Sequence, residues 1–501
     1  MSTTVSVPAV VTKPRSASLP GRALGSAFSF PVAVGAALCA LAVVTSRGRF
    51  NDPEMWRHLK IGEFIWATHT IPAVHTFSPI PGRWVPQEWL SQLAIFGAYH
   101  LGGFSGMIFA FCCLAAAVLA GGYVLCVVYG RSPRAAFPGA LVLFLFAATG
   151  FSIRPQLIGY LLLIGELVIL HLGRIRNPRW FLALPPLFAV WANCHGSFLI
   201  GLAVVAAVLF SSFFDFEIGS LIAEPWRPVR RRVLSIALAF SALAALLNPA
   251  GIRQYLYALD SLLCQPIDLA VVDEWSPLEL SSLRGACFLA LLGAILLLLI
   301  LRKSELYLDE LVLLALAVWL GGSQARQLFV FGILAAPILS RMLANSAHPW
   351  DRRKNRVLPN ALLIAAASVT AVAAFPSPRN INSQIEAQSP ARAVEYMQSH
   401  QLAGSILTEY RYGGYLVWAM PGHPIFVDGR TGLYQWSGVP GQYEQRAAMH
   451  NDHDAALDQY GIQFCLLSAQ SPMAHSLPAD QWKSVYAGNG SILFQRIFAQ
   501  R

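Results

Sequence analysis

Two acidic residues stand directly behind the first long apolar run of the chain. The segment Asn51-Asp52-Pro53-Glu54 places carboxylates at positions i and i+2. Such a pair can hold a divalent cation, or one member can act as a general base. A structural role is the alternative, because acids at the start of a helix are stabilised by its positive end. The spacing alone leaves both interpretations open.

Other charged or titratable residues lie between apolar runs. Arg326 stands in the short turn GGSQARQLF, where a guanidinium could bind a phosphate or form an ion pair with a loop acid. Arg154, in SIRPQ, raises the same question. The pair Asp273-Glu274 is typical of a solvated acidic loop. The alternative is that these acids take part in a reaction. His195, in WANCHGSF, is interpreted as a packed or hydrogen-bonded histidine.

The composition excludes several classes of protein. Of 501 residues, 55% are hydrophobic and 12% are charged, whereas a soluble protein carries about 25% charged residues. A single soluble domain, a disordered chain and a DNA-binding protein are therefore excluded. The eight cysteines form no CxxC or other metal-like spacing, so we predict neither a disulfide framework nor a zinc site.

The apolar residues are gathered in long runs. A membrane-spanning helix needs about 20 mostly apolar residues, and several runs are shorter than that. We predict a polytopic α-helical membrane protein with about 11 transmembrane helices. The runs lie near 28–46, 105–129, 135–151, 155–172, 180–194, 197–214, 233–247, 284–301, 306–321, 327–343 and 357–375.

Lysine and arginine predict the orientation, since they concentrate in the cytoplasmic loops of membrane proteins. They cluster in alternate loops of this chain, which places the N-terminus in the cytoplasm and explains much of the net charge of +10. The first helix is expected to remain uncleaved. The predicted parts are a cytoplasmic tail (1–27), a transmembrane domain (28–375) with outside loops 47–104 and 248–283, and a soluble α/β domain (376–501).

Local patterns predict elements outside the bundle. Apolar residues at helical spacing in MWRHLKIGEFIWATHTI indicate a helix lying flat on the membrane interface, anchored by Trp56 and Trp66. The C-terminal part is expected to hold a helix over 390–401 and another in HDAALDQYG. Strands are expected in GSILTEY, PIFVDG and IQFCLLSA, followed by a hairpin in SVYAGNGSILFQRI.

These motifs resemble those of the GT-C superfamily of membrane glycosyltransferases, and distantly the catalytic subunit of oligosaccharyltransferase. FNDPEMWRHLKIGEF is similar to the first-loop acidic motif, and AVVDEWSPLELSSL to the motif of the catalytic-loop glutamate, here Glu274. SILTEYRYGGYLVWAMPGHPIFVDGRTGLY is similar to the Trp-Trp-Asp-Tyr-Gly segment. The chain departs from that pattern at Arg154-Pro155-Gln156, near the second acidic motif, and at Glu409-Tyr410-Arg411, which replaces Trp-Trp-Asp.

The resemblance implies that a sugar is transferred from a polyprenyl-phosphate or polyprenyl-diphosphate donor to an envelope glycan, lipid or protein on the outer face of a bacterial inner membrane. Membrane lipid is an expected partner and nucleic acid is not. The alternatives are a non-catalytic scaffold for envelope assembly and a transporter of lipid or polysaccharide. The expected catalytic residues are Asp52, Glu54 and Glu274, with Asp52 and Glu274 as candidate ligands for Mg²⁺ or Mn²⁺. The expected phosphate-binding residues are Arg326 and Arg154, and the acceptor-side residues are His58, Glu88, Tyr410, Arg411 and Tyr412.

Overall fold

The computed structural model describes most of the chain. The described residues are 25–47, 52–72, 85–263, 276–301, 304–344, 351, 355–426, 457 and 461–497. Within these ranges, the side chains of residues 148–150 and 410 are not described.

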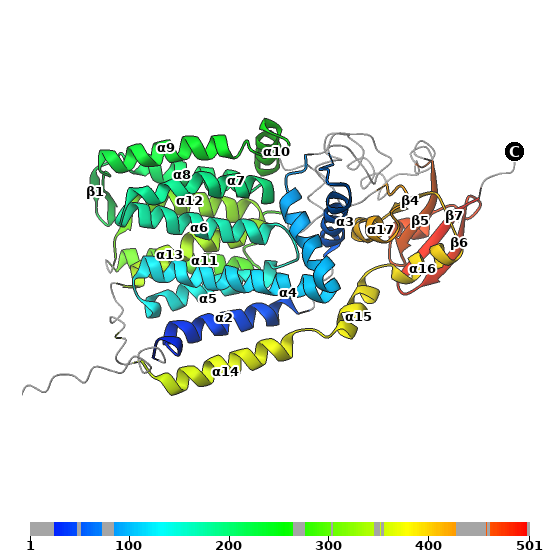
Figure 1. Cartoon of the computed structure of the whole chain (residues 1–501), viewed down its shortest axis with the longest axis horizontal. Helices are drawn as coiled ribbons and strands as arrows, with labels where there is room; N and C mark the ends of the chain where they lie inside the picture. Colours follow the sequence, from blue (N-terminus) through cyan, green and yellow to red (C-terminus); the bar gives the residue numbers. More distant parts are fainter. Residues whose placement is uncertain are drawn as a thin grey trace, which may run out of the picture.

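A large helical bundle is followed by a smaller region of helices and strands (Figure 1). The first and last helices of the bundle, α2 (Phe30–Ser46) and α14 (Val357–Ala374), lie side by side at one edge. The other bundle helices are α4 (Trp89–Gly130), α5 (Pro133–Gly150), α6 (Gln156–Ile175), α7 (Leu184–Cys194), α8 (Phe198–Ser211), α9 (Pro228–Ala244), α11 (Leu283–Ile300), α12 (Leu308–Ser323) and α13 (Leu328–Ala344), with the 3₁₀ helix η1 (Pro178–Ala183) before α7.

Each predicted apolar run coincides with a helix of this bundle. Among the described residues, five helical segments are long and apolar enough to cross a membrane, and shorter apolar helices accompany them. The chain is therefore an integral membrane protein, while the number of about 11 crossings stays a prediction. The five segments are Trp89–Gly130, Gln156–Ile175, Leu283–Ile300, Ala325–Ala344 and Val357–Ala374.

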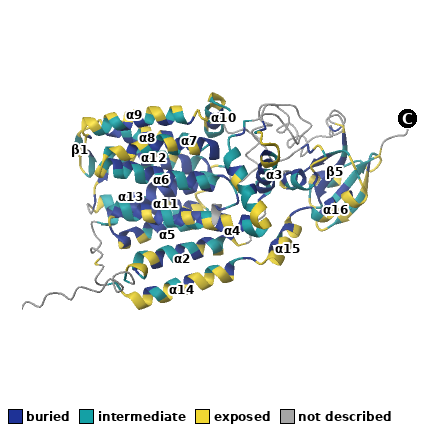
Figure 2. Cartoon of the chain, viewed as in Figure 1, coloured by how far each residue is buried: buried dark blue, intermediate teal, exposed yellow. Residues whose placement is uncertain are grey.

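The outer surface of the bundle is apolar, as a lipid environment requires. Leu283, Leu358 and Val372 are 80%, 71% and 79% exposed, although large aliphatic side chains prefer burial in water. Figure 2 shows such exposed positions along the outer helices α9 and α14, while the inner helices are buried. The core lies between α4, α5, α6 and α13.

The long helix α4 is divided by two glycines. Gly102 and Gly103 have non-helical backbone angles, and Gly103 has φ of +59°, which favours glycine because it has no Cβ. The first arm, before the kink, packs on α3 (Pro53–Thr68). The second arm corresponds to the predicted run 105–129. The kink therefore separates a helix outside the bundle from one inside it (Figure 1).

Helix α3 forms where the sequence predicts it, but one anchor is wrong. Pro53 at its first position and Asp52 at its N-cap start the helix. Trp66 is 48% exposed, whereas Trp56 is only 1% exposed. The Trp56 ring contacts those of Phe104 and Tyr415 at centroid distances of 5.4 and 5.0 Å. Trp56 is therefore a core residue and not an interfacial anchor, because another part of the chain covers it.

The C-terminal region contains a four-stranded sheet in the order β4-β5-β7-β6, with β4 parallel to β5 and the other pairs antiparallel. The helix near 390–401 and the final hairpin are confirmed. Residues 427–429 of the predicted PIFVDG strand fall outside the described residues, as does the helix predicted in HDAALDQYG apart from Leu457 and Gly461. The elements are α15 (Pro378–Gln388), α16 (Ala391–Ser399), β4 (Ser405–Thr408), α17 (Tyr410–Ala419), β5 (Ile462–Ser468), α21 (Pro472–Ser476), β6 (Trp482–Gly488) and β7 (Ser491–Arg496).

Short elements lie at the two ends of the bundle. The strands β1 (Phe216–Ile218), β2 (Leu221–Ala223) and β3 (Leu306–Tyr307) form a small sheet between helix ends. Helix α10 (Ile252–Leu263) and the 3₁₀ helix η3 (Ala325–Gln327) lie at the other end, toward α3. This is the end at which the candidate site is found.

Candidate active site

Asp52 lies where the N-terminus of α3 meets the segment between α5 and α6. Its Oδ1 accepts the backbone N–H of Glu54 at 2.9 Å, so Asp52 does cap the helix. Its Oδ2 accepts Nε of Arg154 at 2.5 Å, and the whole residue is 8% exposed. Asp52 is thus both a cap and one half of a nearly buried ion pair. The capping role is the structural alternative for Asp52, and the ion pair with a loop acid is the alternative for Arg154.

A second acid shares the same cations. Glu54 Oε2 lies 3.6 Å from Arg154 Nε and 3.7 Å from Arg57 Nη2. Burial raises the pKa of Asp52 above its usual value, Arg154 lowers it, and the neighbouring Glu54 raises it again. Arg154 is therefore the group that favours the ionised form of Asp52.

Glu88 lies between two histidines, immediately before α4. Its Oε2 is 3.8 Å from His58 Nδ1, and its Oε1 is 3.7 Å from His195 Nε2. Burial raises the pKa of Glu88 to about 7, although Arg57 opposes this shift. A carboxyl group with such a pKa can exchange a proton at neutral pH.

The hydrogen bonds of His195 indicate which of its nitrogens carries the proton. The backbone N–H of Ser197 donates to His195 Nδ1 at 3.1 Å. Because a backbone N–H can only donate, this Nδ1 acts as an acceptor. The Nε2 of His195 then carries a proton and faces Glu88. The side-chain amide of Gln92 lies 3.2 Å from His58 Nδ1.

Burial keeps both histidines neutral. It lowers the pKa of His58 well below the usual value, and the cation Arg57 lowers it further. It lowers the pKa of His195 to about 3, again with help from a cation, Arg326. Glu88 is therefore flanked by two neutral rings and forms no ion pair with either of them.

Hydrogen bonds between distant segments fix the start of α4. Trp89 Nε1 donates to Asn193 Oδ1 at 2.6 Å, and Ser91 Oγ donates to the carbonyl of Cys194 at 2.8 Å. A Cβ on Gly196 would lie 2.8 Å from Gln87 Oε1, so the end of α7 also approaches the residue before Glu88 closely. The end of α7 thus positions Glu88 and His195 together.

Arg326 belongs to the same electrostatic cluster. It lies in η3, between α12 and α13, and lowers the pKa values of both Glu88 and His195. It also counteracts the rise that burial causes in the pKa of Tyr257. The neighbouring Ala325 donates its N–H to the carbonyl of Ser276 at 2.9 Å. The turn that carries Arg326 is thus tied to the end of the loop that precedes α11.

Arg411 and Tyr412, two of the predicted acceptor-side residues, form contacts within the C-terminal region. Arg411 Nε donates to Glu409 Oε2 at 2.9 Å, and its guanidinium lies 4.8 Å from the centre of the Tyr412 ring. Glu409 Oε1 also accepts the N–H of Ser468 at 2.9 Å. This group fixes the start of α17 on the sheet. The side chain of Tyr410 is outside the described part of the chain.

The residues selected from the sequence thus fall into three groups. Asp52, Glu54 and Arg154 form one ion-pair network, and His58, Glu88 and Arg326 join it through electrostatic interaction. Arg411 and Tyr412 lie at the start of α17, which packs against α3. Glu274 falls outside the described residues.

His195, Arg57 and Gln92 belong to the site although no role there was predicted for them from the sequence. One local signal exists: Gln92 follows Glu88 by four residues, as His58 follows Glu54, and positions i and i+4 share a helix face. The prediction that His195 is hydrogen-bonded is confirmed by its bond to Ser197, but its other nitrogen faces Glu88.

The described residues do not fit a divalent cation at Asp52. Both of its oxygens already accept hydrogen bonds, one of them from a guanidinium that a cation would have to displace. Among the residues that the structure describes, no group of three His, Cys, Asp or Glu side chains could hold a metal ion. Arg154 provides positive charge at this place instead.

Comparison with solved structures identifies the fold. Over 93% of this chain and 74% of the other, it is similar to the archaeal oligosaccharyltransferase AglB from Archaeoglobus fulgidus, in complex with an inhibitory peptide and a dolichol-phosphate (TM-score 0.52, 14% identity). Over 96% and 99%, it is similar to ArnT from Cupriavidus metallidurans bound to undecaprenyl phosphate (TM-score 0.52, 14% identity). The apo ArnT structure gives a TM-score of 0.53 at 13% identity.

No family model and no curated protein matches the chain significantly. At identities this low, the structural similarity establishes the architecture and leaves the reaction to be argued from the site. The predicted resemblance is confirmed at this level: the chain has the fold of the GT-C membrane glycosyltransferases.

Proposed function

We propose that this protein transfers a sugar from a polyprenyl phosphate or polyprenyl diphosphate to an acceptor of the cell envelope, at the outer face of the membrane. One observation carries the proposal: Arg154, which pairs with Asp52, and Arg326 both lower the pKa of the same carboxyl group, Glu88. Acids and guanidinium groups thus meet at one end of a membrane bundle. The AglB and ArnT structures with this fold contain dolichol-phosphate and undecaprenyl phosphate.

A lipid-linked donor explains why the site lies on a membrane bundle. The isoprenoid chain remains in hydrocarbon, while the phosphate and its sugar must reach polar groups at the membrane edge. Arg326 is the proposed phosphate ligand, because its fork of N–H donors matches phosphate oxygens. It would bind the leaving phosphate, where negative charge accumulates in the transition state.

Asp52 is proposed to orient the nucleophile of the acceptor. Its carboxylate is held in place by the N–H of Glu54 and by Arg154, which also favours the ionised form. A hydroxyl of the acceptor attacks the anomeric carbon as the bond from that carbon to the phosphate oxygen breaks. The pair of electrons of that bond leaves with the phosphate, which Arg326 stabilises.

The proton of the attacking hydroxyl needs an acceptor. Glu88, with a pKa of about 7, is proposed to take it, since its proton affinity is close to neutral pH. Glu54 would keep the cations Arg154 and Arg57 in position. Glu274 is proposed to close the site, and the bond between Ser276 and Ala325 supports this by tying the end of its loop to the turn of Arg326.

The C-terminal region is proposed to contact the acceptor. Helix α17 packs on α3, the helix that Asp52 caps, so Tyr410, Arg411 and Tyr412 belong to an element next to the site. A glycan, lipid or protein acceptor would lie between this helix and the membrane end of the bundle.

The test is a transfer assay with the purified chain in liposomes. A polyprenyl phosphate carrying a radiolabelled sugar is supplied with an extract of envelope acceptors, and the release of free polyprenyl phosphate is measured. Transfer with stoichiometric release supports the enzyme. Movement of the intact donor across the bilayer without bond cleavage would favour the transporter, and neither event would favour the scaffold.

A further inference from the structure

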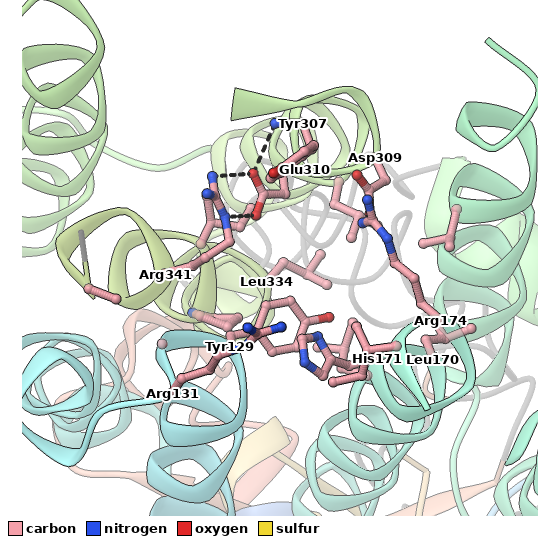
Figure 3. A pocket seen from close by; sticks show the side chains of 18 of the residues that line it. Tyr129, Arg131, Leu170, His171, Arg174, Tyr307, Asp309, Glu310, Leu334 and Arg341 are labelled. Carbon is pink, nitrogen blue, oxygen red and sulfur yellow. Dashed lines mark hydrogen bonds and ion pairs between the residues drawn. The ribbon is translucent and has the colours of Figure 1, made fainter. Parts of the chain in front are cut away.

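A cavity of about 590 Å³ lies at the end of the bundle away from Asp52. Figure 3 shows the side chains that line it. Helix α6 connects the two places, because it begins two residues after Arg154 and ends at Ile175, which lines the cavity. Its 20 residues span about 30 Å at 1.5 Å per residue, which equals the thickness of a hydrocarbon core. The cavity and the candidate active site thus belong to opposite membrane faces.

Two ion pairs form one wall of the cavity. Arg174 pairs with Asp309, and Arg341 pairs with Glu310 through two nitrogens. The ring of Tyr307 lies 5.3 Å from the guanidinium of Arg174 and 4.9 Å from that of Arg341. These acids are already neutralised, so they present little net negative charge to a ligand.

The facing wall carries hydrogen-bond donors that are not neutralised in this way. Arg131 ends α4 with a left-handed backbone, and among the described residues it forms no ion pair. The ring of His171 is tilted by 35° against that of Tyr129, with the ring centres 4.4 Å apart, and its Nε2 is buried without a hydrogen-bond partner in the described part of the chain. In Figure 3 these three residues lie across the cavity from Glu310 and Asp309.

The remaining lining is largely apolar. A third acid, Glu224, also lines the cavity; like Arg131 it is exposed, so water and salt screen both charges. The volume exceeds that of a phosphate group, and the aliphatic side chains can contact a carbon skeleton. The main aliphatic lining residues are Leu167, Leu170, Val208, Leu313, Leu334 and Ile338.

We propose that this cavity binds the phosphate group of an anionic ligand, with Arg131 as its principal partner and His171 as a second donor. A guanidinium fork fits phosphate oxygens, and an orphaned imidazole nitrogen gains a hydrogen bond when a phosphate oxygen occupies the cavity. A phospholipid headgroup and a soluble phosphate ester share this chemistry. The site is distinct from the proposed transfer site, and its occupation does not depend on that reaction.

The experiment uses the full chain, purified and stripped of lipid. Native mass spectrometry measures retention of dioleoylphosphatidylglycerol against dioleoylphosphatidylcholine, and a thermal shift measures binding of glycerol 3-phosphate. Arg131→Asn is the main variant, because asparagine tolerates the left-handed backbone at this position (φ +50°). Arg134→Ala is the control, since Arg134 is exposed at the same end and does not line the cavity.

We expect Arg131→Asn to weaken binding about tenfold, as for a lost charged hydrogen bond, and Arg134→Ala to bind like the wild type. His171→Phe keeps the ring beside Tyr129 but removes the donor, so it should weaken binding as well. Retention of the anionic lipid alone identifies a headgroup site, and binding of the ester identifies a site open to soluble phosphates. Equal binding by the wild type, Arg131→Asn and His171→Phe, or binding of neither probe, overturns the proposal.

Discussion

Gly414 of α17 lies directly against the backbone carbonyl of Pro53, the first residue of α3. A Cβ at position 414 would approach that oxygen far more closely than 3.0 Å. The ring of Tyr415, the next residue, meets Trp56 edge to face at 5.0 Å. Helix α17 of the C-terminal region therefore packs on Pro53, the residue that follows Asp52. A displacement of α17 would move the start of α3 and, with it, Asp52.

Gly414→Ala should lower the rate of sugar transfer while the protein remains folded. The new methyl group must push α17 away from the first turn of α3, which changes the position of Asp52. Gly422→Ala is the matched control, because nothing lies within 4 Å of a Cβ there. Transfer rates and melting temperatures of both variants would be measured. Equal rates for the two would show that this contact does not position the site.

Arg154→Ala should destabilise the protein and shift its pH profile. It leaves Asp52 buried without its cation, a change that costs about 3–5 kcal/mol for a buried pair. Because Arg154 lowers the pKa values of both Asp52 and Glu88, its loss raises both, and the acid limb of the pH–rate profile moves to higher pH. Arg154→Lys should restore part of both properties. An acid limb at the same pH in Arg154→Ala would show that neither carboxyl group controls the rate through Arg154.

Glu88→Gln should remove a titration near neutral pH. If ionised Glu88 accepts the proton, the wild-type rate rises with pH through about 7, and the variant loses that dependence along with about 10²–10⁴ in rate. Glu63→Gln is the control, because Glu63 lies on α3 and pairs with Lys60 away from the site. A pH profile that is unchanged in Glu88→Gln would contradict the proposed role.

Glu88→Gln should also change how the stability of the protein depends on pH. Between pH 4.5, the ordinary pKa of a glutamate, and about pH 7, the folded protein holds a proton on Glu88 that the unfolded chain has released. The stability that this proton contributes is full below about pH 4.5 and is lost as the pH rises to about 7. The melting temperature of Glu88→Gln, relative to wild type, should therefore increase between pH 5 and pH 8. A constant difference would mean that the pKa of Glu88 is not raised.

Arg326→Ala should weaken donor binding. Hydrogen bonds to charged groups contribute about 1.5–3 kcal/mol, so the apparent KM for the lipid-linked donor should rise about 10- to 100-fold. Arg284→Ala removes an exposed arginine at the start of α11 and should change the donor KM little, so it serves as the control. An unchanged donor KM in Arg326→Ala would exclude the phosphate role.

The bundle could be predicted from the sequence because its signal is local. Twenty consecutive apolar residues indicate a helix whatever surrounds them, and the predicted runs coincide with helices. Trp56 shows the limit of such reasoning. Its pattern on α3 fits an interfacial anchor, and only the position of Tyr415, far along the chain, reveals that it is buried.

The acidic residues of the candidate site could be selected from the sequence, but the residues that they contact could not. Asp52 stands out in the sequence because a carboxylate follows a membrane helix. The partner of Asp52 is Arg154, 102 residues away, and a single sequence contains no information on such a contact. The same holds for Glu88 and His195, which meet only because the end of α7 binds the start of α4.

The proposed role of Asp52 is tested by the rate of sugar transfer in Asp52→Asn, measured from a labelled polyprenyl phosphate donor with the full chain in liposomes. Asparagine keeps the size of the side chain and its ability to cap α3, but it lacks the charge that orients the nucleophile. Asp215→Asn, at an exposed position, serves as the control. We expect a loss of at least about 10²-fold in Asp52→Asn alone. A rate equal to that of the wild type in a folded Asp52→Asn protein would contradict that role.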